Sequence, residues 1–138
     1  MKFLFINGVN LDLLGSREPD IYGLDPLEKI NAELKEFCEK NGDEAKFFQS
    51  DIEGEICREI GRAKADAIIL NAGAYSHYSL AIRDAVSSIQ IPAVEVHISN
   101  IFAREEFRSR SVIAPVCRGV ITGFGKNVYK LAVLSFKL

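Results

Sequence analysis

The stretch DAIIL, residues Asp66–Leu70, decides the fold of this chain. It is a short, almost purely apolar run, and a strand without a polar face is typical of a parallel sheet that is covered on both sides. Four further segments are predicted as strands, namely Lys2–Ile6, Glu44–Gln49, Pro92–Ile98 and Gly119–Thr122. The chain is therefore expected to build a five-stranded sheet.

Helical patterns separate the predicted strands. The first begins at Pro26, where the missing N–H costs nothing, and it ends at Asn41-Gly42. Other helices are predicted after residues 50–51, over Ser79–Ile89 and over Lys126–Phe136. Strands that alternate with helices, joined by right-handed crossovers, predict an α/β protein. We expect a flavodoxin-like three-layer sandwich in a single domain of residues 1–138, because no repeat or linker interrupts the chain.

The composition limits the possible partners. The chain has 138 residues, of which 48% are hydrophobic and 26% charged, as is ordinary for one globular domain with a core. Its net charge of −2 favours neither a nucleic-acid backbone nor an anionic membrane surface. The N-terminal apolar run, about five residues long, is far too short for a signal peptide or a membrane span.

The cysteines and histidines give no sign of a metal centre. Cys38, Cys57 and Cys117 are odd in number and widely spaced, and no CxxC pair indicates a zinc site or a redox dithiol. Three free thiols fit a reducing cytoplasm, where we expect the protein to act. Two histidines without clustered cysteines or carboxylates make a poor metal site, so no metal is expected.

A long connection follows the first strand. Residues 7–23 read NGVNLDLLGSREPDIYG, and no helix is expected before about residue 25. Connections beyond ~12–15 residues are commonly either disordered or functional. This one carries apolar anchors that a solvated linker would lack, at Leu11, Leu13, Leu14 and Ile21. Because it also holds Arg17 and Tyr22, we expect it to form a lid over an active site.

Polar side chains gather where the predicted strands end. In open parallel sheets, ligands bind beyond the carboxyl ends of the strands. The residues found there are Asn7, Asn10, Gln49, Ser50, Asn71, Tyr75, His77, His97, Ser99, Asn100 and Thr122. Such a rim suits a small, neutral-to-anionic ligand with several hydroxyl groups. Arg104 and Arg108, just beyond the fourth strand, are candidates to hold a carboxylate in a fork.

Each of these features also has a purely structural explanation. A lone histidine at a strand end is more often structural, but two on one rim, opposite the Arg17 and Tyr22 loop, favour a functional site. The Asn71-Ala-Gly segment fits a plain strand-to-helix turn. A solvated ion-pair face would account for the residues at helical spacing, Arg104, Glu105, Glu106 and Arg108, and for Arg110 beside them.

Two other functions are compatible with this fold class. A non-catalytic module of the receiver type would need acidic residues after the first and third strands, where Asn7 and Asn71 stand. A flavin or nucleotide enzyme would need a phosphate-binding loop rich in glycine or in serine and threonine after the first strand. The Gly123-Phe-Gly125 segment does not supply a dinucleotide motif, because Val128 occupies the third glycine position.

Five stretches of the chain resemble the type II 3-dehydroquinate dehydratases, with motifs in the same order and at similar spacing over nearly the whole length. They are residues 7–23, QSDIEG (49–54), NAGAYSHYSLAIRDA (71–85), EVHISN (95–100) and REEFR (104–108). The resemblance implies a flavodoxin-like subunit, usually assembled as a dodecamer that is built from trimers. It also implies cofactor-free dehydration of 3-dehydroquinate to 3-dehydroshikimate in aromatic amino-acid biosynthesis.

The resemblance also assigns roles to residues. Tyr22 matches the base that removes a proton beside the substrate ketone, and Arg17 matches the cation that activates this base and stabilises the transition state. Asn10, acting through a water, would hold the enolate oxygen. His97 matches the proton donor to the departing hydroxide, and Glu95, on the same strand face, would hold its other nitrogen. The substrate contacts match Asn71, His77, Asp84, Ile98, Ser99 and Arg108, of which Asp84 usually reaches across from a neighbouring subunit.

The chain departs from the pattern of these dehydratases at four positions. Val9 and Ala72 stand where proline is common, and Asp51 replaces a usual asparagine. Ser109 stands where a histidine often follows the arginine that matches Arg108. We expect Ser109 to weaken the substrate clamp and Val9 to loosen the turn that presents the residue after it.

Overall fold

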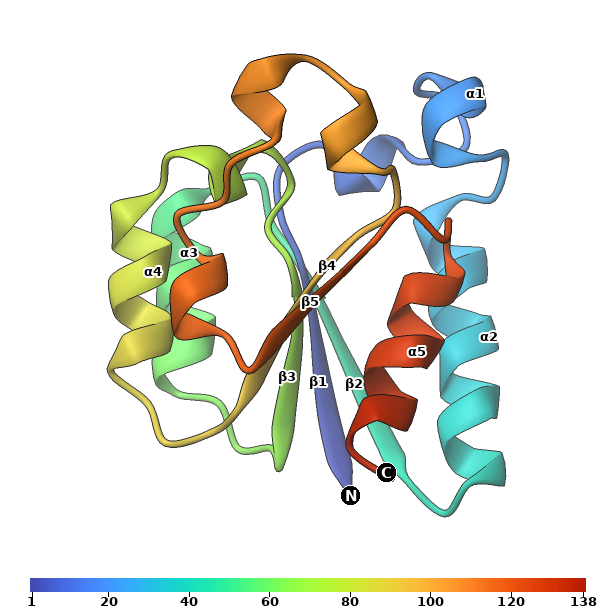
Figure 1. Ribbon diagram of the computed structural model, residues 1–138. Helices are drawn as coiled ribbons and strands as arrows, with labels where there is room; N and C mark the ends of the chain where they lie inside the picture. The colour runs from blue at the N-terminus through green and yellow to red at the C-terminus, as the bar shows by residue number, and fades with distance from the viewer.

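The computed structural model describes residues 1–138 as a three-layer α/β sandwich around one sheet (Figure 1). All five strands are parallel, and their order is β2-β1-β3-β4-β5. Their bounds are β1 Lys2–Asn7, β2 Glu44–Gln49, β3 Ala67–Asn71, β4 Ala93–His97 and β5 Gly119–Thr122. The predicted strands agree with these bounds to within one residue, and the fold class is confirmed.

Two pairs of helices cover the two faces of the sheet (Figure 1). One face carries α2 (Leu27–Lys40) and α5 (Asn127–Ser135), and the other carries α3 (Glu53–Gly61) and α4 (Leu80–Ser87). None of these helices has the length and apolar character that crossing a bilayer would require. The segments that follow the strands lie together at one end of the molecule, where the site residues were expected.

The core lies on both sides of the sheet because side chains alternate along each strand. In β1, Phe3 and Phe5 join the cluster under α2 and α5, whereas Leu4 and Ile6 join the cluster under α3 and α4. Every residue of β3 is buried, as the DAIIL stretch predicted for a strand covered on both faces. The sheet is therefore a rigid platform for the loops that leave its carboxyl edge.

The connection after β1 differs from the expectation. Two short helices lie before residue 25, a 3₁₀ turn at Leu11–Leu13 and α1 at Pro19–Tyr22, so the prediction of a helix-free loop was wrong. Proline at the first position of α1 has no N–H to lose, which allows a single turn to form there. Of the four predicted anchors, Leu11 and Leu14 are buried, but Leu13 and Ile21 are about two-fifths exposed.

The turn after β1 packs directly on the turn after β3. Gly73 has a left-handed φ of 64°, and a Cβ added there would lie 2.8 Å from the backbone oxygen of Val9. Only glycine combines this conformation with so close an approach. Val9 and Ala72, two of the positions that depart from the dehydratase pattern, therefore lie at this close contact between the two turns.

Candidate active site

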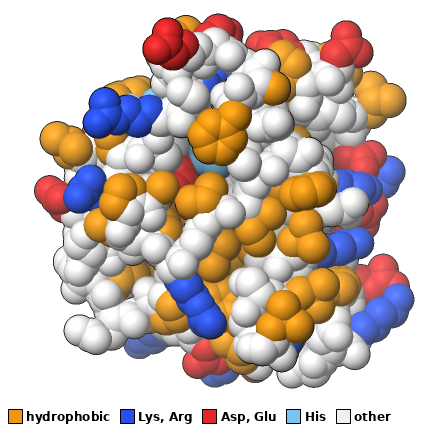
Figure 2. Space-filling model, viewed as in Figure 1, with side chains coloured by type: hydrophobic (Ala, Val, Ile, Leu, Met, Phe, Trp, Pro, Cys, Tyr) orange, Lys and Arg blue, Asp and Glu red, His pale blue; other side chains and the backbone are white.

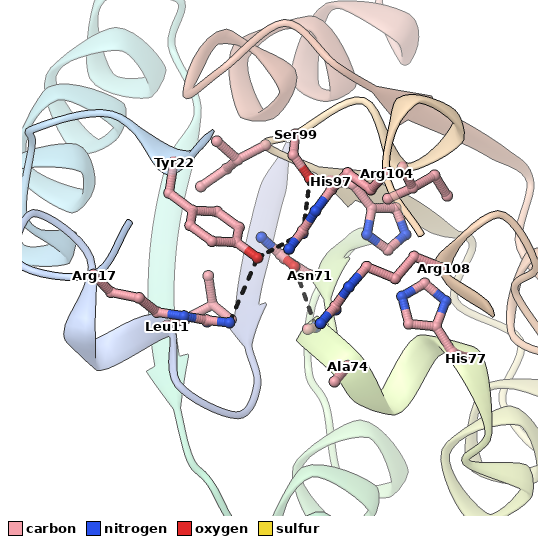
Figure 3. Close-up of a pocket in the computed structure, with 13 residues that line it drawn as sticks. Leu11, Arg17, Tyr22, Asn71, Ala74, His77, His97, Ser99, Arg104 and Arg108 are labelled. Carbon is pink, nitrogen blue, oxygen red and sulfur yellow. Dashed lines mark hydrogen bonds between the residues drawn. The ribbon is translucent and has the colours of Figure 1, made fainter. Parts of the chain in front are cut away.

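A pocket opens at the carboxyl ends of the strands, beneath the connection that follows β1 (Figure 3). It encloses about 410 Å³, including its open mouth, which is a size usual for a small-molecule site. Its lining comes from the loop after β1, the turn after β3, the end of β4 and the segment that follows β4. The lining residues are Leu11, Arg17, Tyr22, Asn71, Gly73, Ala74, His77, His97, Ile98, Ser99, Ile101, Arg104 and Arg108.

The hydroxyl of Tyr22 lies between two guanidinium groups (Figure 3). It accepts hydrogen bonds from Nη1 of Arg104 at 2.6 Å and from Nη2 of Arg17 at 3.5 Å. Both guanidinium carbons also lie near the face of the phenol ring, at 4.6 Å for Arg17 and 5.2 Å for Arg104 from its centroid. Two positive charges thus contact one phenol, and each lies where it would attract a negative charge on the phenol oxygen.

His97 is hydrogen-bonded to a buried carboxylate on the side away from the pocket. Its Nε2 lies 2.7 Å from Oε1 of Glu95, and both side chains are almost completely buried. The hydroxyl of Ser111 donates to both carboxylate oxygens of Glu95, at 2.7 and 3.0 Å. When Glu95 is ionised it can only accept, so the Nε2 proton points toward it and Nδ1 is left available for the pocket.

His77 has its ring orientation set in the same way. Its Nδ1 lies 2.8 Å from the carbonyl oxygen of Arg110, and a carbonyl only accepts, so Nδ1 carries the proton. Nε2 of His77 is therefore left for a ligand. The His77 and His97 rings stack with their centroids 6.2 Å apart and their planes 17° apart, which places two imidazoles side by side on one wall.

The charges in the lining favour an anionic ligand. Three arginines line the pocket, whereas none of its lining residues carries a carboxylate. Glu105 lies outside the lining, pairs with Nε of Arg108 at 2.9 Å and lies 3.8 Å from Nε of Arg104. A backbone hydrogen bond and the charge of Arg108 hold the pKa of Glu105 below its usual range. One carboxylate thus offsets part of the three positive charges, and the lining keeps a net positive charge.

The structure gathers eight of the predicted site residues into this lining, from segments far apart in the sequence. They are Arg17, Tyr22, Asn71, His77, His97, Ile98, Ser99 and Arg108. Three predicted residues lie outside it. Glu95 is behind His97, and Asp84 is exposed on α4. Asn10 has a left-handed φ of 66°, and its backbone N–H donates to Asp51 at 2.9 Å.

For Arg104 the sequence left two interpretations open, a carboxylate-binding residue or part of a solvated ion-pair face, and the structure places it in the pocket lining. The spacing of residues 104–108 suggested a solvated helical face, but the segment instead forms two separate 3₁₀ turns, Ile101–Ala103 and Glu106–Arg108. Arg104 falls between these turns in extended backbone, and its side chain is only 13% exposed. Arg110 is exposed and pairs with no carboxylate. An arginine five residues beyond Ser99 was the only signal, and it did not distinguish a pocket residue from a surface one.

No group of three or more histidine, cysteine, aspartate or glutamate side chains is arranged to hold a metal ion. The pocket contains the phenol of Tyr22 between two guanidinium groups and the imidazole of His97 hydrogen-bonded to the Glu95 carboxylate. Both groups lie at the carboxyl ends of the strands, where ligands bind in parallel sheets of this kind. Such groups are typical of enzymes that act by acid–base chemistry, and the positive charges of the lining suit a small anionic molecule.

The chain belongs to the class II dehydroquinase family, whose profile matches residues 1–137. It is 53% identical over 137 residues to the 3-dehydroquinate dehydratase of a Nitratiruptor species, covering 98% of this chain and 88% of that protein. It is also 53% identical to that of Bacillus subtilis (strain 168), covering 95% and 90%. The crystal structure of type II dehydroquinase from Butyrivibrio crossotus superposes with a TM-score of 0.98 at 45% identity, covering 100% of this chain and 98% of that one.

Proposed function

We propose that this enzyme removes water from 3-dehydroquinate to give 3-dehydroshikimate in two steps, through an enolate, with side chains alone as catalysts. The observation that carries the proposal is the Tyr22 hydroxyl held between Arg17 and Arg104 in the same pocket as His97. Family membership and the names of the relatives support the overall reaction.

In the first step, Tyr22 acts as the base. Its phenolate oxygen takes a proton from the carbon beside the ketone, and the electron pair of the broken C–H bond forms the enolate. Arg17 and Arg104 stabilise the phenolate before the transfer, because both positive charges contact its oxygen and opposite charges attract. Asn10 would hold the enolate oxygen through a water, since it lies on the turn beside the pocket but not in its lining.

In the second step, His97 acts as the acid. The enolate electron pair forms the new C=C bond, the C–O bond breaks, and His97 gives its proton to the departing hydroxyl, which leaves as water. Glu95, held by Ser111, stabilises the imidazolium before it gives up that proton. A positioned acid and a positioned base each typically contribute ~10²–10⁴ in rate.

The remaining lining residues would bind the hydroxyl and carboxylate groups of the substrate. Arg108 uses Nε for Glu105, which leaves its terminal nitrogens for a forked contact. Asn71 and His77 offer an amide and an imidazole nitrogen, and the Ile98–Ser99 segment offers backbone groups and a hydroxyl. These groups line the pocket together and suit a ligand with several oxygen atoms.

We further propose that the active form is a homo-oligomer, a dodecamer assembled from trimers. Asp84 matches a substrate contact but lies exposed on α4, outside the pocket of its own chain, so it would serve the pocket of a neighbouring subunit. Apolar side chains also gather on the face where β5 and α5 lie (Figure 2). Val120, Leu131 and Leu134 are each about two-fifths exposed there, as is usual for a contact surface.

A cytoplasmic place of action is part of the same proposal. All three cysteines are free thiols, which is usual in a reducing compartment. Burial raises the pKa of Cys38 to about 11 and that of Cys117 to about 12, so these two stay protonated and unreactive at neutral pH.

The test is direct. Purified protein is mixed with 3-dehydroquinate in buffer that contains a metal chelator and no cofactor, and the rise in enone absorbance is followed. We expect turnover that the chelator does not reduce. Tight binding of the ligand without turnover would favour a non-catalytic module, and a requirement for flavin or nucleotide would favour the other alternative.

A further inference from the structure

Two buried asparagines lie at the ends of neighbouring strands, and one of them, Asn71, lines the pocket. Asn7 ends β1 and Asn71 ends β3, and the two are paired in the sheet register. Asn7 is 2% exposed and Asn71 is 4% exposed, so their amides need partners within the protein. The partner that they share is Tyr129, a completely buried tyrosine on α5.

The hydrogen bonds around Tyr129 can run in only one direction. The backbone N–H of Gly73 donates to Oδ1 of Asn71 at 3.2 Å, so the Nδ2 group of Asn71 must be the one that lies toward Tyr129. This group donates to the phenol oxygen at 2.9 Å. The single phenol proton is then free for Oδ1 of Asn7, which lies at 2.6 Å.

Every other arrangement of these groups leaves a buried atom unpaired. If the Asn71 amide turned over, Nδ2 would lie against the Gly73 N–H, and two donors would meet. A buried polar atom without a hydrogen-bond partner destabilises the folded state, so this arrangement is disfavoured. Burial raises the pKa of Tyr129 far above its usual value, so the phenol stays neutral and keeps its ability both to donate and to accept.

We propose that Tyr129 is a positioning residue, which holds the Asn71 amide so that its second Nδ2 hydrogen and the remaining lone pair of Oδ1 face the substrate. The inference rests on the proposed function, in which Asn71 contacts the substrate. Tyr129 acts from α5, which packs on the face of the sheet to which the Asn7 and Asn71 side chains point, and it lies outside the pocket lining, so it touches neither substrate nor reacting atoms. Asn7 also contributes, because its Oδ1 accepts the hydrogen bond from the Tyr129 hydroxyl, which therefore cannot donate to Asn71.

A purely structural role is the alternative. The Tyr129 ring packs in the core, with its centroid 6.3 Å from that of Phe5. Tyr129→Phe keeps this packing and removes only the hydroxyl. The effect of the change on the Asn71 amide can therefore be separated from its effect on the core.

The experiment is a double-mutant cycle on turnover of 3-dehydroquinate with Tyr129→Phe, Asn71→Ala and the double variant. We expect Tyr129→Phe to lower kcat/KM about 10-fold, mainly by raising KM, because one orienting hydrogen bond is lost. In the Asn71→Ala background the same change should have less than about a twofold effect. Tyr78→Phe, at a tyrosine that is 62% exposed, is the matched control and should leave kcat/KM unchanged.

The result that overturns the proposal is an equal loss from Tyr129→Phe in both backgrounds, or no loss in either. Asn7→Ala provides a second variant if Tyr129→Phe does not fold. It frees the phenol proton to meet Asn71, and its effect should likewise disappear in the Asn71→Ala background. An inactive wild-type protein would refute the proposed function instead, and an active wild type with additive losses would refute only the role of Tyr129.

Discussion

Arg104 donates a hydrogen bond of 2.6 Å to the hydroxyl of Tyr22, which lies 82 positions earlier in the chain. Arg17, five positions before Tyr22, makes the longer contact of 3.5 Å. The nearer cation in space is thus the more distant one in sequence. Both arginines are therefore expected to stabilise the negative charge that this oxygen carries as a phenolate.

Replacement of Tyr22 by phenylalanine should remove the base. We expect kcat to fall by at least about 10² because a general base typically contributes ~10²–10⁴. The side chain is only half-buried at the lid, so the thermal midpoint should change little. Steady-state kinetics and a thermal melt check both points. Near-normal turnover in a folded Tyr22→Phe protein would exclude this residue as the base.

Arg104→Gln should lower kcat by about 10-fold or more, because it removes a charge-assisted hydrogen bond to the catalytic phenol. Arg17→Lys should also be damaging, since a point charge on a flexible stem does not replace a fixed guanidinium. Arg110→Gln is the matched control, because the Arg110 side chain is exposed and outside the pocket. Equal activities of the Arg104 and Arg110 variants would contradict the role of Arg104.

Arg108→Ala should raise KM more than it lowers kcat, because its terminal nitrogens face the pocket as a clamp for the substrate rather than for the reacting atoms. An increase of about 10-fold is expected for a lost contact to a charged group. Arg110→Ala should leave KM unchanged. Initial rates over a range of substrate concentrations make the comparison, and similar KM values for the two variants would count against the clamp.

Ser111→Ala should slow proton donation by His97. The change removes both hydrogen bonds from Ser111 to Glu95, so the carboxylate is held by the imidazole alone. We expect kcat to fall by about 5- to 10-fold. Ser111 also accepts from the backbone N–H groups of Ile113 and Ala114, so a thermal melt must accompany the kinetics. Ser111→Thr keeps the hydroxyl and should restore kcat; if it does not, the hydroxyl is not the group that matters.

Asp43 should make the stability of the fold depend on acidity. Burial alone would raise the pKa of Asp43, but hydrogen bonds from Lys137 and the N-terminal ammonium outweigh it and hold the pKa below the usual 3.8. A depressed pKa means that this contribution is present above about pH 4 and is lost as the pH falls through the folded-state pKa.

Asp43→Asn should therefore lower the free energy of unfolding by about 1–3 kcal/mol at pH 7, and the difference from the wild type should shrink as the pH falls below 3.8. Urea unfolding at pH 7 and at pH 3 measures it. Asp12→Asn, at an exposed position of the 3₁₀ turn Leu11–Leu13, is the control and should have no effect at either pH. A difference of the same size at both pH values would show that the charge of Asp43 is not the cause.

The layers of the fold and the edge that carries the site followed from local pattern. Apolar runs, helical spacing and turn residues such as Pro26 act within a few positions, so they are visible before any packing is known. The alternation of strands and helices then leaves few arrangements, and in each of them Asn71 and His97 lie at the same edge. The resemblance to a known family supplied the roles of residues that pattern alone left open.

The partners of these residues were decided only by the tertiary structure. Arg104 turns toward Tyr22 because the segment after β4 breaks into two 3₁₀ turns instead of one helix. Tyr129 reaches Asn71 across 58 positions because α5 packs on the sheet from the face opposite α3 and α4. Neither contact has a local signal in the sequence, since each depends on how elements far apart in the chain pack against one another. A hydrogen bond that joins distant segments is a property of packing, and the order of residues along the chain does not encode it by any local rule.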